Sequence, residues 1–187
     1  MPNREEALEL LHEYTQKQGL IKHALAVEAA MRAYARKFND NEDKWAIVGL
    51  LHDFDYDKFP SPSQHPEVGA RILKDRDYPD DIIYAIRSHA DYLGLERKSL
   101  MDRTLFAVDE LAGFITAVAL VRPNKNIDDV KVSSVKKKLK DKAFARTVNR
   151  DDIRKGIEDL GLPLDGHISF VIDAMRGIAV ELGLNGS

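Results

Sequence analysis

The chain of 187 residues is long enough for one well-buried core, and a composition of 44% hydrophobic and 32% charged residues is ordinary for a globular protein. Its formal net charge of −3 gives no general attraction to nucleic acid or anionic membranes, and no apolar run approaches the roughly 20 residues that cross a bilayer. Because the chain has no cysteine, disulfides and thiolate metal sites are excluded, and any metal is bound through nitrogen and oxygen.

Apolar residues recur at helical spacing from the start of the chain. The first stripe covers residues 7–14 and is expected to stop at Gly19. A second stripe covers residues 24–38 and ends at the turn-forming residues 39–41, and a third runs over residues 45–52. These patterns predict three helices in the first quarter of the chain.

The middle of the chain begins with a segment that is not periodic. Residues 53–63 contain two prolines, which favours an ordered loop. Helices are expected at about 66–75 and 79–89, and a long, very apolar helix over 101–119 is bounded by Pro123.

The last third continues the helical pattern. An amphipathic stretch over 132–139 lies among lysines, and helices are expected near 150–160 and 163–183. No stretch shows sustained strand alternation bounded by hairpin signals. The sequence therefore predicts an all-α fold, a compact helical bundle forming a single domain over residues 1–187, with C-terminal helices at 130–185 packed on its core.

Four polar residues occupy positions that favour a metal site. His23 lies one turn before the apolar stripe of its helix, and His52 ends the third helix on its buried face. Asp53 follows directly, and Asp109 lies within the most apolar helix. A buried carboxylate is costly unless a cation compensates it. Each residue has an ordinary structural reading, such as a hydrogen-bonded core histidine, but the four together favour a metal, with iron, manganese, zinc or nickel suiting these ligands better than calcium.

The same residues carry a family resemblance. His23, the pair His52-Asp53 after two leucines, and Asp109 form an ordered set that resembles the signature of the HD-domain superfamily, over about residues 20–120. The resemblance implies an all-α fold and a metal-dependent phosphohydrolase acting on nucleotides or other phosphoesters. It further implies that these four residues ligate a first metal, with Asp53 as the catalytic residue.

Two further histidines bear on the number of metals. HD proteins with a two-metal centre have a similar stretch to His65-Pro66-Glu67-Val68-Gly69 and a later histidine that His89 resembles. The resemblance implies that both histidines bind a second ion and that Asp53 bridges the two ions. The cofactor expected is a pair of divalent transition-metal ions, with iron or manganese favoured and magnesium, nickel or zinc as alternatives. The other reading is a helix-start cap for the first histidine and a dipole-stabilised helix end for the second. His12 and His167 lie outside this set.

The loop after the His-Asp pair departs from that family pattern. Many two-metal HD proteins carry a lysine three residues after the aspartate, whereas Tyr56 stands there in this chain. The nearest lysine, Lys58, is the candidate for contacting a substrate phosphate. Asp55 is expected to be a solvated loop carboxylate, and Arg71 and Arg87 are expected to be surface ion-pair partners.

The function expected is hydrolysis, by metal-activated water, of a phosphoester of a nucleotide or another small phosphorylated metabolite. Two alternatives stay open: a non-catalytic nucleotide-binding regulatory module, and a di-iron oxygenase, since some HD relatives use this kind of ligand set for oxidation. The lysines of segment 131–142 are expected to form the solvated side of a helix, with no interleaved aromatic residues, so no nucleic-acid partner is expected. The polar, acidic amino-terminal segment predicts a cytoplasmic protein without a membrane partner.

Overall fold

In the computed structural model, which describes residues 2–186, the chain is all-helical, as predicted. This part of the chain contains ten α-helices and two short 3-10 helices (η1 and η2) but no β-strand, and one isolated bridge pairs Asn126 with Asn185. In chain order the elements are α1 (Arg4–Tyr14), α2 (Gln18–Phe38), α3 (Glu42–Leu51), α4 (Glu67–Asp75), α5 (Asp80–Ser88), η1 (Asp91–Leu93), α6 (Leu100–Leu120), η2 (Ile127–Asp129), α7 (Val132–Leu139), α8 (Arg150–Leu160), α9 (Leu164–Arg176) and α10 (Ala179–Leu182).

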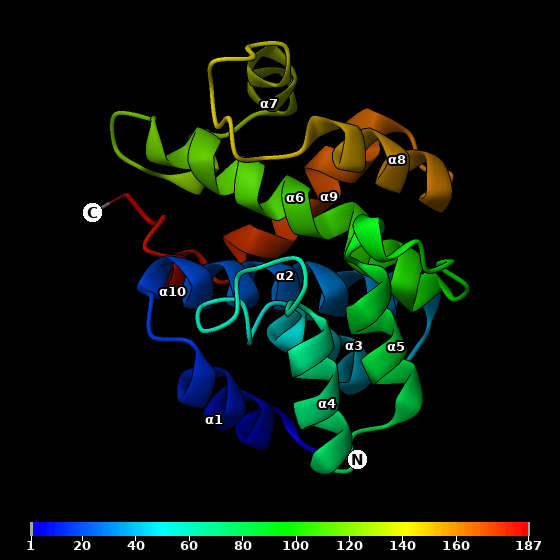
Figure 1. Cartoon of the computed structure of the whole chain (residues 1–187). Coiled ribbons are helices and arrows are strands. Elements are labelled where there is room, and N and C mark those ends of the chain that lie inside the picture. Colours follow the sequence, from blue (N-terminus) through cyan, green and yellow to red (C-terminus); the bar gives the residue numbers. More distant parts are fainter. Residues whose placement is uncertain (1, 187) are drawn as a thin grey trace.

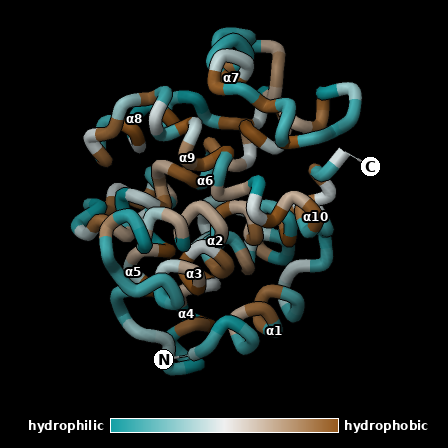
Figure 2. The backbone as a smooth tube through the Cα atoms, turned by 180° about the vertical axis from the view of Figure 1, so that it is seen from behind, coloured by the Kyte–Doolittle hydropathy of each residue, from teal (hydrophilic) through white to brown (hydrophobic). Residues whose placement is uncertain are grey.

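The two longest helices, α2 and α6, form the centre of the molecule. In the view of Figure 1, α1, α3, α4 and α5 lie below them and α7 and α8 above. The most extensive packing is between α2 and α3, between α6 and α8, and between α2 and α6. Figure 2 shows hydrophobic residues gathered where α2, α3, α6 and α9 meet. None of the helices in residues 2–186 is long and apolar enough to cross a membrane.

Two of these helix contacts depend on glycine. A Cβ atom on Gly49 of α3 would lie 2.8 Å from the Cα atom of Glu28 on α2, and one on Gly156 of α8 would lie 2.6 Å from the Cα atom of Ala107 on α6. Because neither distance leaves room for a side chain, glycine lets each pair of backbones approach closely. The α2–α3 contact also positions His52, whose side chain bonds to the carbonyl of Gly49.

Helix ends mostly follow the predicted signals. Asn39 adopts a φ of 56° and ends α2, Asn41 caps α3 by accepting from the backbone of Lys44, and Ser99 begins α6 in a capping box with Asp102. These local features explain why the sequence already located the boundary between α2 and α3 and the start of α6.

Two boundaries were predicted wrongly. The first helix ends at Tyr14, and Gly19 instead lies in the first turn of α2. The cause is a tertiary contact, because the carboxylate of Asp57 accepts from the backbone N–H groups of Gln16 and Lys17 and fixes the turn between the helices. The helix expected over 163–183 is divided into α9 and α10 by a turn after residue 176.

Candidate metal centre

The six predicted ligands converge from several elements. His23 and Asp109 lie on α2 and α6, His52 and His89 directly follow α3 and α5, and Asp53 and His65 lie in the loop between α3 and α4. The six residues form two groups, and in each group one ligand atom per residue lies within 4.8 Å of the others. The first group is His23, His52 and Asp109, and the second is Asp53, His65 and His89.

In the first group, two imidazoles converge on one carboxylate oxygen. The Nε2 atom of His23 lies 2.9 Å from Oδ1 of Asp109, and the Nε2 atom of His52 lies 3.4 Å from the same oxygen. The two Nε2 atoms are 3.2 Å apart. The Nδ1–H of His52 donates to the carbonyl of Gly49 at 2.8 Å, so the lone pair of its Nε2 faces the centre of the group.

In the second group, Asp53 lies between the two sets of histidines. Its Oδ1 atom is 3.2 Å from Nε2 of His65 and 3.3 Å from Nε2 of His89. Its Oδ2 atom is 3.6 Å from Nε2 of His52, which belongs to the first group. One carboxylate therefore presents a different oxygen to each group, which is the arrangement of a bridging ligand.

The histidines of the second group are held by their other nitrogen atoms. His65 donates from Nδ1 to Oδ1 of Asp55 at 2.7 Å, and Oδ2 of Asp55 accepts from the backbone N–H of Gly69 at 2.8 Å. The Nδ1–H of His89 donates to the carbonyl of Ile86. Each contact orients the ring and leaves Nε2 pointing at Asp53, as second-shell hydrogen bonds do in metal sites. His65 therefore does not cap a helix.

The prediction for Asp55 is wrong. The sequence predicts a solvated carboxylate, but only 1% of the surface of Asp55 is exposed. The loop has no hydrophobic period from which burial could be read. A signal was nevertheless present, because the start of α4 at Glu67 offers unpaired backbone N–H groups, and Asp55 accepts from one of them at Gly69.

The loop geometry gives a testable prediction through Gly69→Ala. The new Cβ atom would lie 2.9 Å from the carboxyl group of Asp55 and 3.0 Å from the ring of Phe54, so Asp55 must move and release His65. We expect metal affinity to fall by about 10- to 100-fold, the usual cost of losing a second-shell partner. Gly19→Ala is the matched control, because nothing lies within 4 Å of its Cβ position. Equal metal affinity of the two variants, measured by competition with a chelator, would contradict this role of Asp55.

Attraction between the buried carboxylates and imidazoles favours the charged forms of Asp53 and His65. Burial opposes ionisation of Asp53, but His52 and the hydrogen bonds from His65 and His89 hold its pKa well below the usual range. Burial likewise opposes the charged form of His65, but Asp53 and Asp55 raise its pKa to about 9. Without a cation, the cluster is therefore stabilised by protons on His52, His65 and His89, whose pKa values are all raised.

These pKa shifts predict a pH-dependent metal affinity. A metal must displace the proton from His65, so affinity is expected to rise roughly tenfold per pH unit for each proton released. The metal-free protein behaves oppositely: the stabilisation from protonated His65 is complete below its unfolded pKa of about 6.5 and is lost as pH rises through about 9. Competition titrations between about pH 6 and about pH 8 measure the slope, which His65→Ala should reduce. A flat profile would mean that no proton is displaced.

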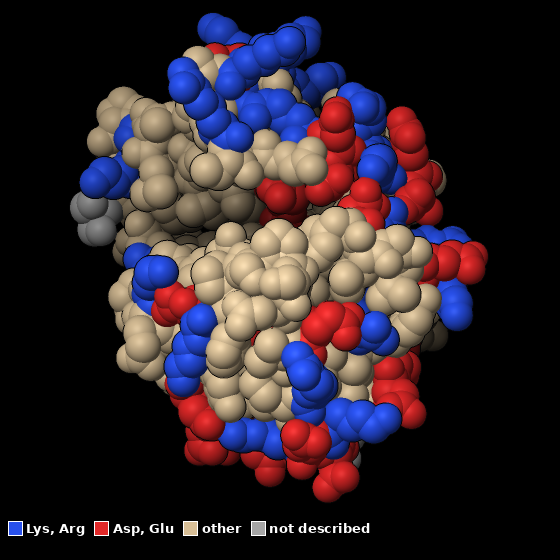
Figure 3. All heavy atoms as spheres, in the orientation of Figure 1, with Lys and Arg blue, Asp and Glu red and all other residues tan. Residues whose placement is uncertain are grey.

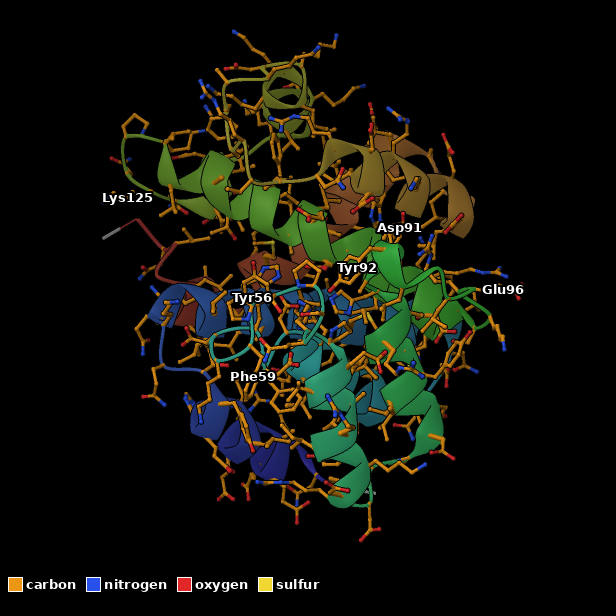
Figure 4. The ribbon with its side chains drawn as sticks, in the orientation of Figure 1. Tyr56, Phe59, Asp91, Tyr92, Glu96 and Lys125 are labelled. Carbon is orange, nitrogen blue, oxygen red and sulfur yellow. The ribbon has the colours of Figure 1, made fainter. Side chains whose placement is uncertain are left out.

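The two groups open onto a cleft of about 780 Å³, a volume typical of small-molecule sites. Figure 3 shows a hollow between the α6–α8 side and the loop below it. Figure 4 labels two tyrosines of the lining, Tyr56 on the loop after α3 and Tyr92 on η1. The hydroxyl of Tyr92 donates to the carbonyl of His65 at 2.6 Å, and the Tyr56 ring meets the His65 ring edge-on. Sequence reasoning did not single out Tyr92, because a short turn after a helix gives no periodic signal.

One wall of the cleft, near Asp109, is acidic. Asn149 donates from its backbone to Glu110 at 3.1 Å and from its side chain to Asp152 at 2.8 Å. Burial, reinforced by the neighbouring Asp109, raises the pKa of Glu110 to about 7. Burial also raises the pKa of Asp152, with Asp91 contributing. Lys155 and Arg97 offset the shift of Asp152 only in part, so both carboxyl groups ionise less readily than exposed ones.

The basic residues considered in the sequence do not reach the cleft. Lys58 was predicted to contact a substrate phosphate, but its ammonium group donates to the carbonyl of Glu13 at 2.8 Å and lies over the ring of Tyr14, outside the cleft lining. The geometry therefore does not support a substrate contact for Lys58. Arg87 pairs with Glu67 at 2.8 Å, as expected of a surface ion-pair partner.

The helical fold and the paired histidine–aspartate groups define an all-α protein with a candidate centre for divalent metal. The HD domain family matches residues 20–113, half of the chain, and this segment contains all six converging residues. The chain belongs to the HD domain family. No solved structure matches the chain significantly. The superfamily commonly consists of metal-dependent phosphohydrolases, although some HD proteins are non-catalytic.

Proposed function

We propose that this protein is a metal-dependent phosphohydrolase that cleaves a phosphoester of a nucleotide or another small phosphorylated metabolite. The observation that carries the proposal is the pair of ligand groups that meet at Asp53 and open onto a cleft of small-molecule size. The donor set fits divalent transition metals, since imidazole nitrogens and carboxylate oxygens converge on each group. Iron or manganese is favoured, with magnesium, nickel and zinc as alternatives.

The proposed ligand assignment follows the two groups. His23, His52 and Asp109, with Oδ2 of Asp53, would hold one ion. Oδ1 of Asp53, with His65 and His89, would hold a second. The fixed Nδ1 contacts of three of the histidines support this assignment, because a preoriented ring loses little freedom when it binds a metal.

In the proposed reaction, the bound ions and the side chains of the protein have different roles. Bound divalent ions would make water acidic enough to attack phosphorus and would neutralise phosphoryl charge. Asp53, with one oxygen toward each group, would be a ligand of both ions. The hydrogen bond to Asp55 keeps the proton of His65 on Nδ1, away from the reacting centre. Tyr92, in the lining of the cleft, donates to the backbone carbonyl of His65 and so connects the lining to the second group.

The test is release of phosphate from a panel of nucleotides and small phosphoesters by protein loaded with manganese or iron. We expect turnover of at least one ester, lost on chelation and restored by metal. A protein that binds metal and nucleotide without turnover would be a regulatory module. Oxygen consumption with iron would instead indicate the oxygenase alternative.

The number of ions is tested by the double variant His65→Ala/His89→Ala. It removes two ligands of the second group and leaves His23, His52 and Asp109 intact. We expect about half of the wild-type metal content by elemental analysis, a retained fold and the loss of most turnover, because a two-metal site stabilises both attacking and leaving oxygens. Full metal content and activity would mean a single ion and no ligand role for these histidines.

A further inference from the structure

The cleft carries more acidic than basic groups away from the candidate ligands. Its lining contains four further carboxylic residues and two basic ones: Asp91, Glu110, Asp151, Asp152, Arg154 and Lys155. Figure 3 shows acidic atoms along the wall formed by α6 and the start of α8. Both basic residues already have acidic partners, since Arg154 pairs with Asp151 at 2.8 Å and Lys155 pairs with Asp91 at 2.7 Å. In the part of the lining that the structure describes, each basic residue thus already has an acidic partner.

Two carboxyl groups of this wall face the cleft without an ion-pair partner. Within residues 2–186, the polar contacts of Asp152 and Glu110 are to the same residue, Asn149, at 2.8 and 3.1 Å. An amide donor satisfies one oxygen of each group and leaves acceptor capacity for a ligand. The wall can thus accept hydrogen bonds from a cationic or amino group.

Arg150 holds the loop that precedes this wall in the chain. The guanidinium group of Arg150 lies 5.2 Å from the ring centroid of Phe114 and donates to five backbone carbonyl groups. These belong to Leu139, Asp141, Phe144, Ala145 and Val148, at distances of 2.5–3.4 Å. Arg150 therefore fixes the loop that leads into Asn149, so the acceptors are positioned before a ligand arrives.

The metal end of the cleft and the wall of Asp152 would have opposite charge once metal is bound. Two divalent ions would exceed the formal charge of Asp53, Asp55 and Asp109 and would leave the metal end positive, whereas Asp152 would keep the neighbouring wall acidic. A ligand complementary to both parts carries its anion at the metal end and its cation at the wall. A polyphosphate chain would instead place negative charge against Asp152.

We propose, on the basis of the phosphohydrolase activity above, that the substrate is a small phosphomonoester with an ammonium group remote from its phosphoryl group. The phosphoryl group lies at the metal end, and the ammonium group donates to Asp152 and Glu110. Tyr56 and Tyr92, which are 40% and 56% exposed and contact His65, offer aromatic surface in the same cleft (Figure 4). Hydrolysis forms a bond from water oxygen to phosphorus and breaks the ester P–O bond, and a proton from water passes to the leaving oxygen. The products are an amino alcohol and inorganic phosphate.

The test compares ligands of similar size that differ in charge. Binding of 3-aminopropylphosphonate and butylphosphonate, which have no hydrolysable ester bond, is measured by calorimetry on manganese-loaded protein. We expect the amino ligand to bind roughly tenfold more tightly, the effect of one charge-assisted hydrogen bond. Asp152→Asn should reduce this preference, because it removes the charge of one of the two acceptors. Asp128→Asn, whose side chain is 72% exposed and lies outside the cleft lining, should keep it.

Measurements of turnover distinguish a failure of this inference from a failure of the proposed function. Phosphoethanolamine should show a lower KM than ethyl phosphate, and nucleoside triphosphates should be poorer substrates than the monophosphates. Equal binding of the two phosphonates, or a preference for triphosphates, would overturn the inference even if phosphoesters are hydrolysed. If no ester is hydrolysed but the amino ligand is preferred, the proposed function is wrong and the binding specificity stands.

Discussion

Asp53→Ala is expected to lose both metal binding and phosphoester hydrolysis. Among residues 2–186, Asp53 is the one carboxylate whose two oxygens face different ligand groups, 3.2 Å from His65 and 3.6 Å from His52. Its removal takes a ligand from each proposed ion and leaves the surrounding histidines to repel one another. Losing the shared ligand should reduce turnover to background. Elemental analysis and phosphate release from the same preparation measure both effects.

The matched control is His12→Ala, because His12 is an exposed residue of α1 and lies outside both ligand groups. It should keep wild-type metal content and activity. Asp53→Asn adds a second comparison, since it keeps the shape of the side chain but removes the charge that attracts the cations. Activity that survives in both Asp53 variants would locate the reaction elsewhere or in a contaminant.

The second large effect is expected on stability. A metal that binds only the folded state stabilises it by about 2.7 kcal/mol when present at 100 times its dissociation constant. For a domain of this size that corresponds to a shift of roughly 5–10 °C in the melting temperature. Removing metal by chelation and dialysis should therefore lower the melting temperature by that amount, and adding metal back should restore it.

The quadruple variant His23→Ala/His52→Ala/His65→Ala/His89→Ala is the control for this measurement. Its melting temperature should not respond to metal, because its imidazole ligands are gone. If verified removal of metal leaves the melting temperature of the wild-type protein unchanged, the six residues do not anchor an ion in the folded state.

The sequence located the helical part of the site well. His23 and Asp109 lie on helices, and His52 directly follows one. The apolar period of these helices indicates which face is buried, so the inward direction of the three side chains could be predicted. The all-α fold followed from the same periodicity. The single-domain organisation stays a prediction, with support from a hydrophobic cluster that runs from Ala7 to Leu184.

The parts that the sequence missed depend on contacts between distant segments. Asp55 is buried only because α4 brings Gly69 to it, and Asp152 faces the cleft only because α8 packs on α6 through Gly156. The two histidines outside the site also looked equivalent. His12 is exposed, whereas His167 is buried and links α9 to α2 and α6 through hydrogen bonds to Tyr34 and the carbonyl of Ala107.

The most direct test of the central claim is a titration of metal-free protein with manganese while phosphate release is followed. The two ligand groups and the shared Asp53 predict no turnover without metal and a rise that saturates near two equivalents per chain. The same titration of Asp53→Ala should stay at background. Turnover that needs no metal, or its absence at every metal loading, would contradict the assignment of this site as a metal-dependent phosphohydrolase.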